Sequence, residues 1–196
     1  MPKCYSEQER EYIREQLKKE ATKCLCQYGI RKTTVDELVK RVKIPKGTFY
    51  LFYQSKELLL FEVILEQHEL MNQKLMEEVS GLDKKNISTE KLTEIIVKIY
   101  QMIDDNPILK VLNSDEIELL ARKLPQEVIM EHIGYDRSVI DELLQVIPGK
   151  KDVDMKALSA AFRSIYFTTL HKDKIGKESY EKGLEMLVYG LVHQMI

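Results

Sequence analysis

A short segment near the N-terminus brings together side chains suited to binding nucleic acid. Lys46, Gly47, Thr48 and Tyr50 supply a cation, a bare backbone position, a hydroxyl group and a phenol within one run of sequence. Cationic and hydroxyl side chains bind phosphate oxygens, and polar groups in a groove also reach base edges. A glycine between them lets the backbone approach the nucleic acid closely. We therefore predict that these four residues contact DNA.

Two short helices and a tight turn are predicted to position these side chains. Thr34 and Glu37 form a capping box, which satisfies free N–H groups at a helix start, and apolar residues then recur at helical spacing. Pro45 suits the first turn of a second helix, over about residues 45–51, where its missing N–H costs nothing. Ser55 offers an N-cap for a long third helix. The order is typical of a helix-turn-helix with a supporting helix behind it.

The segment from Gly29 to Leu58 resembles the DNA-binding domain of the TetR family of bacterial transcriptional regulators. The elements of the family pattern, in order, are Gly29 after the first helix, Thr33-Thr34, the apolar helix Val35 to Val42, Gly47-Thr48-Phe49-Tyr50, and Ser55-Lys56-Glu57. The resemblance implies a homodimer that binds a double-stranded DNA operator. It also implies a small-molecule effector, and we expect a repressor that this effector releases from the operator.

Two residues depart from the family pattern. Lys43 stands where the family usually has a turn glycine, so a non-glycine residue is expected to take a positive φ, at a cost of about 1 kcal/mol. Phe52 stands where a histidine or tyrosine often touches phosphate, and a phenyl ring cannot donate that hydrogen bond. Both departures support the alternative interpretation, a helical ligand-binding or interaction protein that has lost DNA binding.

Residues that flank the second helix are predicted to bind the DNA backbone. Thr33, Thr34 and Lys56 are the expected phosphate contacts, because helix N-termini bind phosphate without reading the base sequence. For Leu51 two interpretations stay open. It either packs in the core of the small domain or makes apolar contact with a thymine methyl group.

Composition and charge predict an all-α protein of about nine helices in two domains. The 196 residues include only 8 Gly and 5 Pro and no Trp. The predicted domains are a helix-turn-helix DNA-binding domain over residues 1–57 and a helical ligand-binding and dimerisation domain over residues 58–196. Residues 1–58 hold 13 Lys and Arg against 8 Asp and Glu, whereas residues 59–196 hold 17 against 24. Attraction to DNA is therefore expected at one end of the chain.

Several classes of protein are disfavoured by what the sequence lacks. No apolar run approaches the roughly 20 residues that cross a bilayer, and the N-terminus has no signal-peptide core, so we expect a cytoplasmic protein without membrane association. The 3 cysteines and 4 histidines show no metal-binding spacing. No catalytic signature stands out, and we predict neither an enzyme nor a metal or cofactor site.

The resemblance implies an effector pocket in the C-terminal domain. The candidate lining residues, for each of which ordinary core packing is the alternative, are Met71, Met76, Tyr100, Met102, Met130, Tyr135, Phe162 and Tyr166. Since this domain is acidic and these side chains are mostly apolar, an apolar or cationic ligand is expected.

The last two helices carry small residues that suggest a dimer interface. The candidates are Ala157, Ala161, Gly183, Leu187 and Gly190. Gly183 and Gly190 share one helix face, and glycine inside a helix costs roughly 1 kcal/mol against alanine. That cost favours close approach of another helix, either from a second subunit, as in the family, or from within the same chain.

Overall fold

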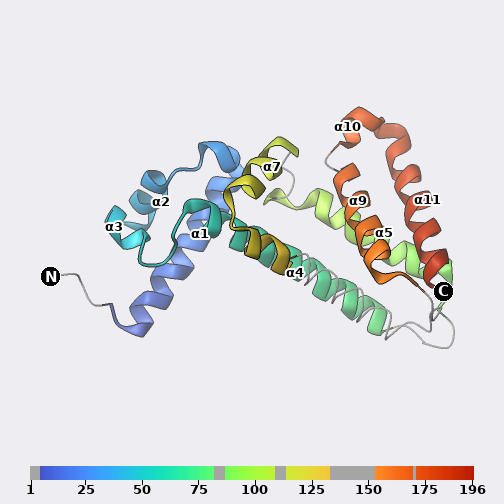
Figure 1. Ribbon diagram of the computed structural model, residues 1–196, viewed down its shortest axis with the longest axis horizontal. Coiled ribbons are helices and arrows are strands. Elements are labelled where there is room, and N and C mark those ends of the chain that lie inside the picture. The colour runs from blue at the N-terminus through green and yellow to red at the C-terminus, as the bar shows by residue number, and fades with distance from the viewer. Residues whose placement is uncertain (1–4, 82–86, 109–113, 133–152, 170) are drawn as a thin grey trace. The chain divides into compact units, whose positions relative to one another are not determined.

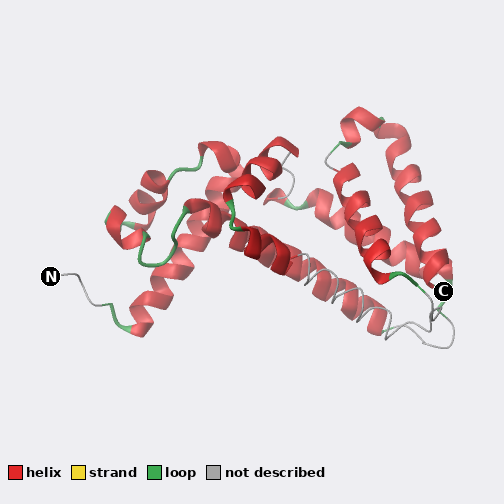
Figure 2. Cartoon of the chain, in the orientation of Figure 1, coloured by secondary structure: helices red, strands yellow, loops and turns green. Residues whose placement is uncertain are grey.

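The computed structural model of the chain describes residues 5–81, 87–108, 114–132, 153–169 and 171–196. These residues form helices joined by loops, and none of them lies in a β-strand (Figure 2). The helices are α1 (Glu7–Lys32), α2 (Val35–Val42), α3 (Lys46–Phe49), α4 (Lys56–Ser80), α5 (Thr89–Asp105), α7 (Ser114–Lys123), α9 (Met155–Thr169), α10 (Lys172–Ile175) and α11 (Lys177–Met195) (Figure 1). The predicted all-α class is confirmed.

The chain divides into two compact units. The first contains Met1–Gln67 and Pro107–Leu124, and the second contains His68–Asn106 and Pro125–Ile196. Helix α4 runs without interruption past the point where the first unit ends. The predicted domains, residues 1–57 and 58–196, are defined by function, whereas these two units are defined by packing. The domain boundary after residue 57 therefore stays a prediction.

The first unit is built around α1, which begins at a capping box and kinks at Gly29, where the first helix was expected to end. The Ser6 N–H donates to Glu9 Oε2 (2.8 Å) and the Glu9 N–H donates to Ser6 Oγ (3.3 Å), so the capping box is complete. At Gly29 the backbone leaves the helical conformation (φ 72°, ψ −174°) and a last helical turn follows. Leu17 and Leu25 are among the residues of α1 that are fully buried.

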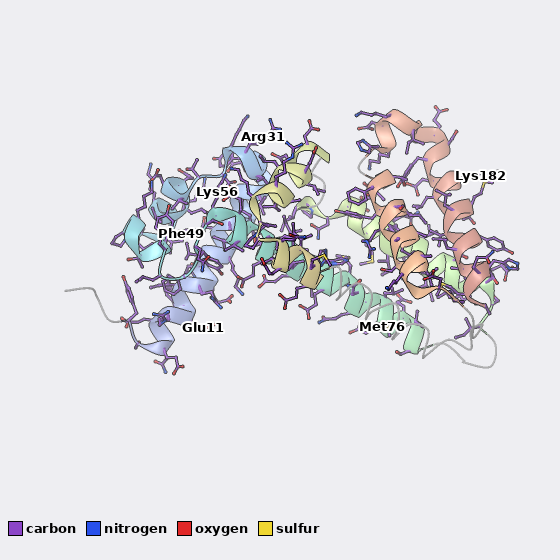
Figure 3. All side chains as sticks on the ribbon, viewed as in Figure 1. Glu11, Arg31, Phe49, Lys56, Met76 and Lys182 are labelled. Atoms are coloured by element: carbon purple, nitrogen blue, oxygen red, sulfur yellow. The ribbon has the colours of Figure 1, made fainter. Side chains whose placement is uncertain are left out.

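The small core of the first unit contains two aromatic rings from the helix-turn-helix. Phe49 and Tyr53 are both buried, with ring centroids 6.0 Å apart (Figure 3). The Tyr53 N–H donates to the Phe49 carbonyl (3.0 Å), and this helical turn places the two side chains on the same side of the chain. Leu38 from α2 and Leu59 from α4 are fully buried in the same unit.

The second unit packs α5, α9 and α11 against one another, with α10 leading into α11 (Figure 1). The Tyr100 hydroxyl on α5 donates to the Phe162 carbonyl on α9 (2.9 Å), and Lys172 on α10 pairs with Asp104 on α5. The short helix α10 was not expected from sequence.

Within the described ranges, none of the helices combines the length and the apolar character that crossing a lipid bilayer requires.

Candidate nucleic-acid interface

The first helix of the predicted motif ends in a tight turn at Lys43. Thr34 Oγ1 accepts the Glu37 N–H (3.2 Å) and so caps α2 at its start. Lys43 ends the helix in the left-handed conformation (φ 60°, ψ 43°), and its N–H donates to the Val39 carbonyl. The expected positive φ at this non-glycine residue is therefore confirmed.

The predicted recognition helix has one regular α-helical turn, and hydrogen-bonded β-turns follow it. Helix α3 spans Lys46–Phe49 after Pro45, with no side-chain cap. Beyond it, the Leu51 N–H donates to the Thr48 carbonyl (3.1 Å) and the Phe52 N–H donates to the Phe49 carbonyl (3.0 Å). These i to i+3 bonds tighten the end of the helix. Together they hold the predicted segment 45–51 in one compact arrangement.

One side of this segment faces solvent and is rich in the predicted contact residues. Lys46 and Gly47 are exposed, and Tyr50 and Leu51 are 51% and 53% exposed. Core packing of Leu51, one of its two interpretations, is therefore wrong for this structure. We call Lys46, Gly47, Tyr50 and Leu51 the recognition surface.

Two of the predicted DNA contacts instead point into the unit. Thr48 is buried, with its hydroxyl 3.4 Å from the Tyr5 hydroxyl. Thr33 is 0% exposed, and its hydroxyl donates to the Gly29 carbonyl (2.7 Å). Their side chains stabilise the unit, so direct contact between these hydroxyl groups and DNA has no support in this geometry. Thr34 remains exposed while it caps α2.

Lys56 also turns inward. Its ammonium group donates to the Ile30 carbonyl (2.8 Å) and to the Thr33 carbonyl, which ties the start of α4 to the end of α1 (Figure 3). Burial lowers the pKa of the Lys56 ammonium group. A phosphate contact from Lys56 would require these hydrogen bonds to break, so its predicted role as a phosphate clamp is not supported.

The cation of the recognition surface already has a partner of opposite charge. Lys46 Nζ lies 2.9 Å from Asp36 Oδ1 on α2, and both side chains are largely exposed. This hydrogen bond raises the pKa of Lys46. An exposed ion pair of this kind contributes only about 0–1 kcal/mol, so a phosphate can replace Asp36 at little cost.

A carboxylate from α7 binds backbone N–H groups at the kink of α1, in the same unit. Glu116 Oε1 accepts the Ile30 N–H (3.1 Å) and the Arg31 N–H (3.4 Å), directly after Gly29. Lys123, also on α7, pairs with the buried Glu57 of α4 (3.1 Å). The sequence did not predict the hydrogen bond between Ile30 and Glu116, because 86 residues separate them and no local spacing connects them.

The candidate pocket residues differ in how far they are removed from water. Met71 and Tyr100 are buried, whereas Met130 is 58% exposed. The half-buried residues of the set are Met76, Met102, Phe162 and Tyr166. Removal of the phenol from water raises the pKa of Tyr166 to about 12. Tyr135 lies outside the described residues. A pocket among the buried members stays a prediction, and Met130 is at the surface instead.

Three of the candidate dimer residues lie on a face of α11 that the other described elements leave open. Among the residues that the structure describes, no atom of another element lies within 4 Å of a Cβ atom added at Gly183 or Gly190. Leu187, on the same face, is 52% exposed. Ala157 on α9 is exposed and Ala161 is half-buried. Close packing of the two glycines against another described helix of the same chain has no support in this geometry, and the dimer interface stays a prediction.

Comparison with known proteins places this arrangement among bacterial regulators. The chain is 28% identical over 127 residues to the uncharacterized HTH-type transcriptional regulator YdgC of Bacillus subtilis (strain 168), and the alignment covers 58% of this chain and 63% of that protein. It is 26% identical over 136 residues to the "Probable acrEF/envCD operon repressor" of Escherichia coli (strain K12), covering 67% of this chain and 60% of that protein. The aligned segments thus span less than two thirds of either relative.

The fold itself is shared over most of the chain. The transcriptional regulator FadR of Bacillus subtilis, solved in complex with stearoyl-CoA, superposes with a TM-score of 0.60 at 18% sequence identity, covering 91% of this chain and 96% of that one. Residues 18–63 match the family described as "Bacterial regulatory proteins, tetR family", and they include α2, α3 and the recognition surface. The sequence match to the tetR family thus lies in the helix-turn-helix region, and the similarity to known regulators extends from there into the second unit.

Proposed function

We propose that this protein is a DNA-binding transcriptional regulator, and that the recognition surface inserts into the major groove of an operator. The observation that carries the proposal is the exposure of Tyr50 and Leu51, large side chains that follow α3 and leave half of their surface in water. A phenol and an isobutyl group suit base edges and thymine methyl groups. Lys46 beside them supplies a charge for phosphate.

The regulator acts as a homodimer through α9 and α11. A dimer presents two identical recognition surfaces to successive major grooves, about one helical turn apart on a near-palindromic site. The open face of α11 supports this arrangement, since Gly183 and Gly190 leave room for a second helix and Leu187 offers it an apolar contact. A two-fold interface would bring the same face of the partner against it.

Repression relieved by a small molecule in the cytoplasm is the form of regulation that we favour. The name of the Escherichia coli relative, an operon repressor, supports this choice over activation. An effector that is apolar or cationic fits the buried Met71 and Tyr100 and the partly buried Tyr166 of the second unit. The alternative function, a helical interaction protein without DNA binding, predicts no affinity for the operator.

Fluorescence anisotropy with labelled duplexes tests this function. The probe is the DNA upstream of the protein's own coding sequence, and a scrambled duplex of equal length and composition is the control. We expect tighter binding to the upstream duplex, and weaker binding to both as salt rises, because phosphate contacts release counterions. If neither duplex is bound even at low salt, the protein is not a DNA-binding regulator and the alternative function stands.

A further inference from the structure

We propose that Arg10, near the start of α1, binds a DNA phosphate at the edge of the recognition surface. The inference rests on the proposed function and adds a contact that lies outside the helix-turn-helix. Arg10 Cζ lies 5.4 Å from the ring centroid of Phe52, the residue that directly follows Tyr50 and Leu51. The guanidinium group is therefore held beside the segment that carries the recognition surface.

The start of α1 lies near α3 because Tyr5, which precedes α1, contacts Thr48. The Tyr5 hydroxyl lies 3.4 Å from the Thr48 hydroxyl on α3. Ser6 then caps α1, and the Arg10 N–H donates to the Ser6 carbonyl (2.9 Å) in its first turn. Arg10 is thus fixed at its backbone by a capped helix and at its side chain by Phe52.

The charge of Arg10 is available to a ligand, whereas several other cations of the unit are already paired. Arg10 is exposed and forms no ion pair among the described residues. By contrast, Lys46 pairs with Asp36, and Arg41 pairs with Glu37 (2.6 Å). A phosphate that approaches Arg10 replaces water alone, so no protein ion pair has to break.

The chemistry of the pair favours a phosphate as the ligand. Phe52 has no hydrogen-bond donor, but its ring attracts a cation through the negative face of the π system. An aromatic contact restrains the guanidinium while its N–H groups remain free to donate. A planar guanidinium then binds two phosphate oxygens at once, which a lysine cannot do. Such a contact positions the protein on the duplex without reading bases.

The salt dependence of DNA binding tests the role of Arg10. With the full-length protein and the scrambled duplex, we expect Arg10→Ala to bind more weakly and to reduce the slope of log K against log salt by about 1, the loss of one phosphate contact. Arg10→Lys should recover the slope but only part of the affinity, because the charge returns without the bidentate geometry. In the double variant with Phe52→Leu, the second change should add nothing to Arg10→Ala.

Arg14→Ala is the matched control. Arg14 lies one turn further along α1, is also exposed, and sits over a buried ring, with Cζ 5.5 Å from the centroid of Tyr53. We expect its removal to leave the slope unchanged. An equal fall in slope in both variants would mean a general effect of charge and would overturn the assignment to Arg10.

The two proposals fail in different ways. If the wild-type protein binds with a salt-dependent affinity and Arg10→Ala shows the same slope and affinity, the Arg10 inference is wrong while the proposed function stands. If the wild-type protein binds no duplex, both are wrong.

Discussion

The carboxylate of Glu116 lies where Gly29, given any side chain, would place its Cβ atom. A Cβ built at residue 29 would be 2.5 Å from Glu116 Oε1 and 2.8 Å from Oε2. The backbone of Gly29 (φ 72°, ψ −174°) also occupies a region that only glycine enters readily. The kink of α1 and the position of α7 therefore depend on each other. The Glu116 carboxylate leaves no room for a side chain at residue 29, and it also accepts the Ile30 N–H.

Gly29→Ala is expected to destabilise the protein. Backbone strain alone costs about 1–3 kcal/mol, and the displaced carboxylate would leave the Ile30 N–H without its acceptor. Urea denaturation measures the change in the free energy of unfolding. Glu116→Gln, which keeps a carbonyl oxygen as acceptor, should lose less stability than Glu116→Ala. Equal stability of wild type and Gly29→Ala would contradict the role given to this contact.

Gly47→Ala should leave the fold intact and weaken DNA binding. A Cβ at residue 47 would meet no atom of the described residues within 4 Å, and the residue is exposed. The free energy of unfolding is therefore expected to stay the same or rise slightly. The added methyl group would instead stand where the backbone is predicted to approach the DNA. Anisotropy titrations beside urea denaturation separate the two effects. Unchanged DNA affinity would mean that Gly47 does not face the duplex.

Lys46 and Asp36 should have opposite effects on non-specific DNA binding. Lys46→Ala is expected to weaken binding to operator and scrambled duplexes alike and to reduce the salt slope by about 1, if its partner is a phosphate. Asp36→Asn removes the competing carboxylate 2.9 Å from Lys46 Nζ and should strengthen binding to the scrambled duplex. If Lys46→Ala instead lowers discrimination between the duplexes while scrambled binding holds, Lys46 reads a guanine edge.

Gly183→Ala should separate helix stability from dimerisation. Within one chain the change is favourable by up to about 1 kcal/mol, because alanine is the better helix former and open space surrounds residue 183. In a dimer whose helices approach closely at this face, the same methyl group would push them apart. Sedimentation velocity is expected to show weaker association. A dimer of unchanged or greater strength would place the interface elsewhere.

Alkaline pH is expected to reduce stability through Tyr166. Burial raises the pKa of this phenol from its ordinary value of 10.0 to about 12. Between these values the unfolded chain releases the proton while the folded chain keeps it, so the free energy of unfolding falls as pH rises. Urea denaturation across this range should show a smaller fall for Tyr166→Phe than for wild type. An identical fall would mean that the Tyr166 phenol is ionised as readily in the folded protein.

Local sequence was sufficient for the capped starts of α1 and α2. Ser6 with Glu9 and Thr34 with Glu37 are three residues apart, so the hydrogen bonds that start α1 and α2 form within one turn. The left-handed turn at Lys43 was expected from the resemblance, because the family usually has a turn glycine at this position. Interactions of such short range depend little on the rest of the chain, and for that reason the motif could be recognised.

Burial of individual side chains could not be predicted in this way. Thr33, Thr48 and Lys56 occur in the motif beside Tyr50 and Leu51, and their polarity alone suggests exposure for all three. Whether such a side chain turns inward depends on acceptors supplied by other elements. The carbonyl groups at the end of α1 hold Lys56, and the hydroxyl of Tyr5 lies against Thr48.

By itself, the sequence determined the all-α class, the helix-turn-helix and the basic character of the N-terminal region, since these follow from spacing and composition along the chain. Only the tertiary structure decided which residues of that motif remain on the recognition surface. The contact of Glu116 with the backbone after Gly29 and the contact of Arg10 with Phe52 are seen only in the tertiary structure. So is the absence of any described neighbour beside Gly183. These relationships join residues far apart in sequence, or depend on what does not pack against a helix, and no local pattern encodes either.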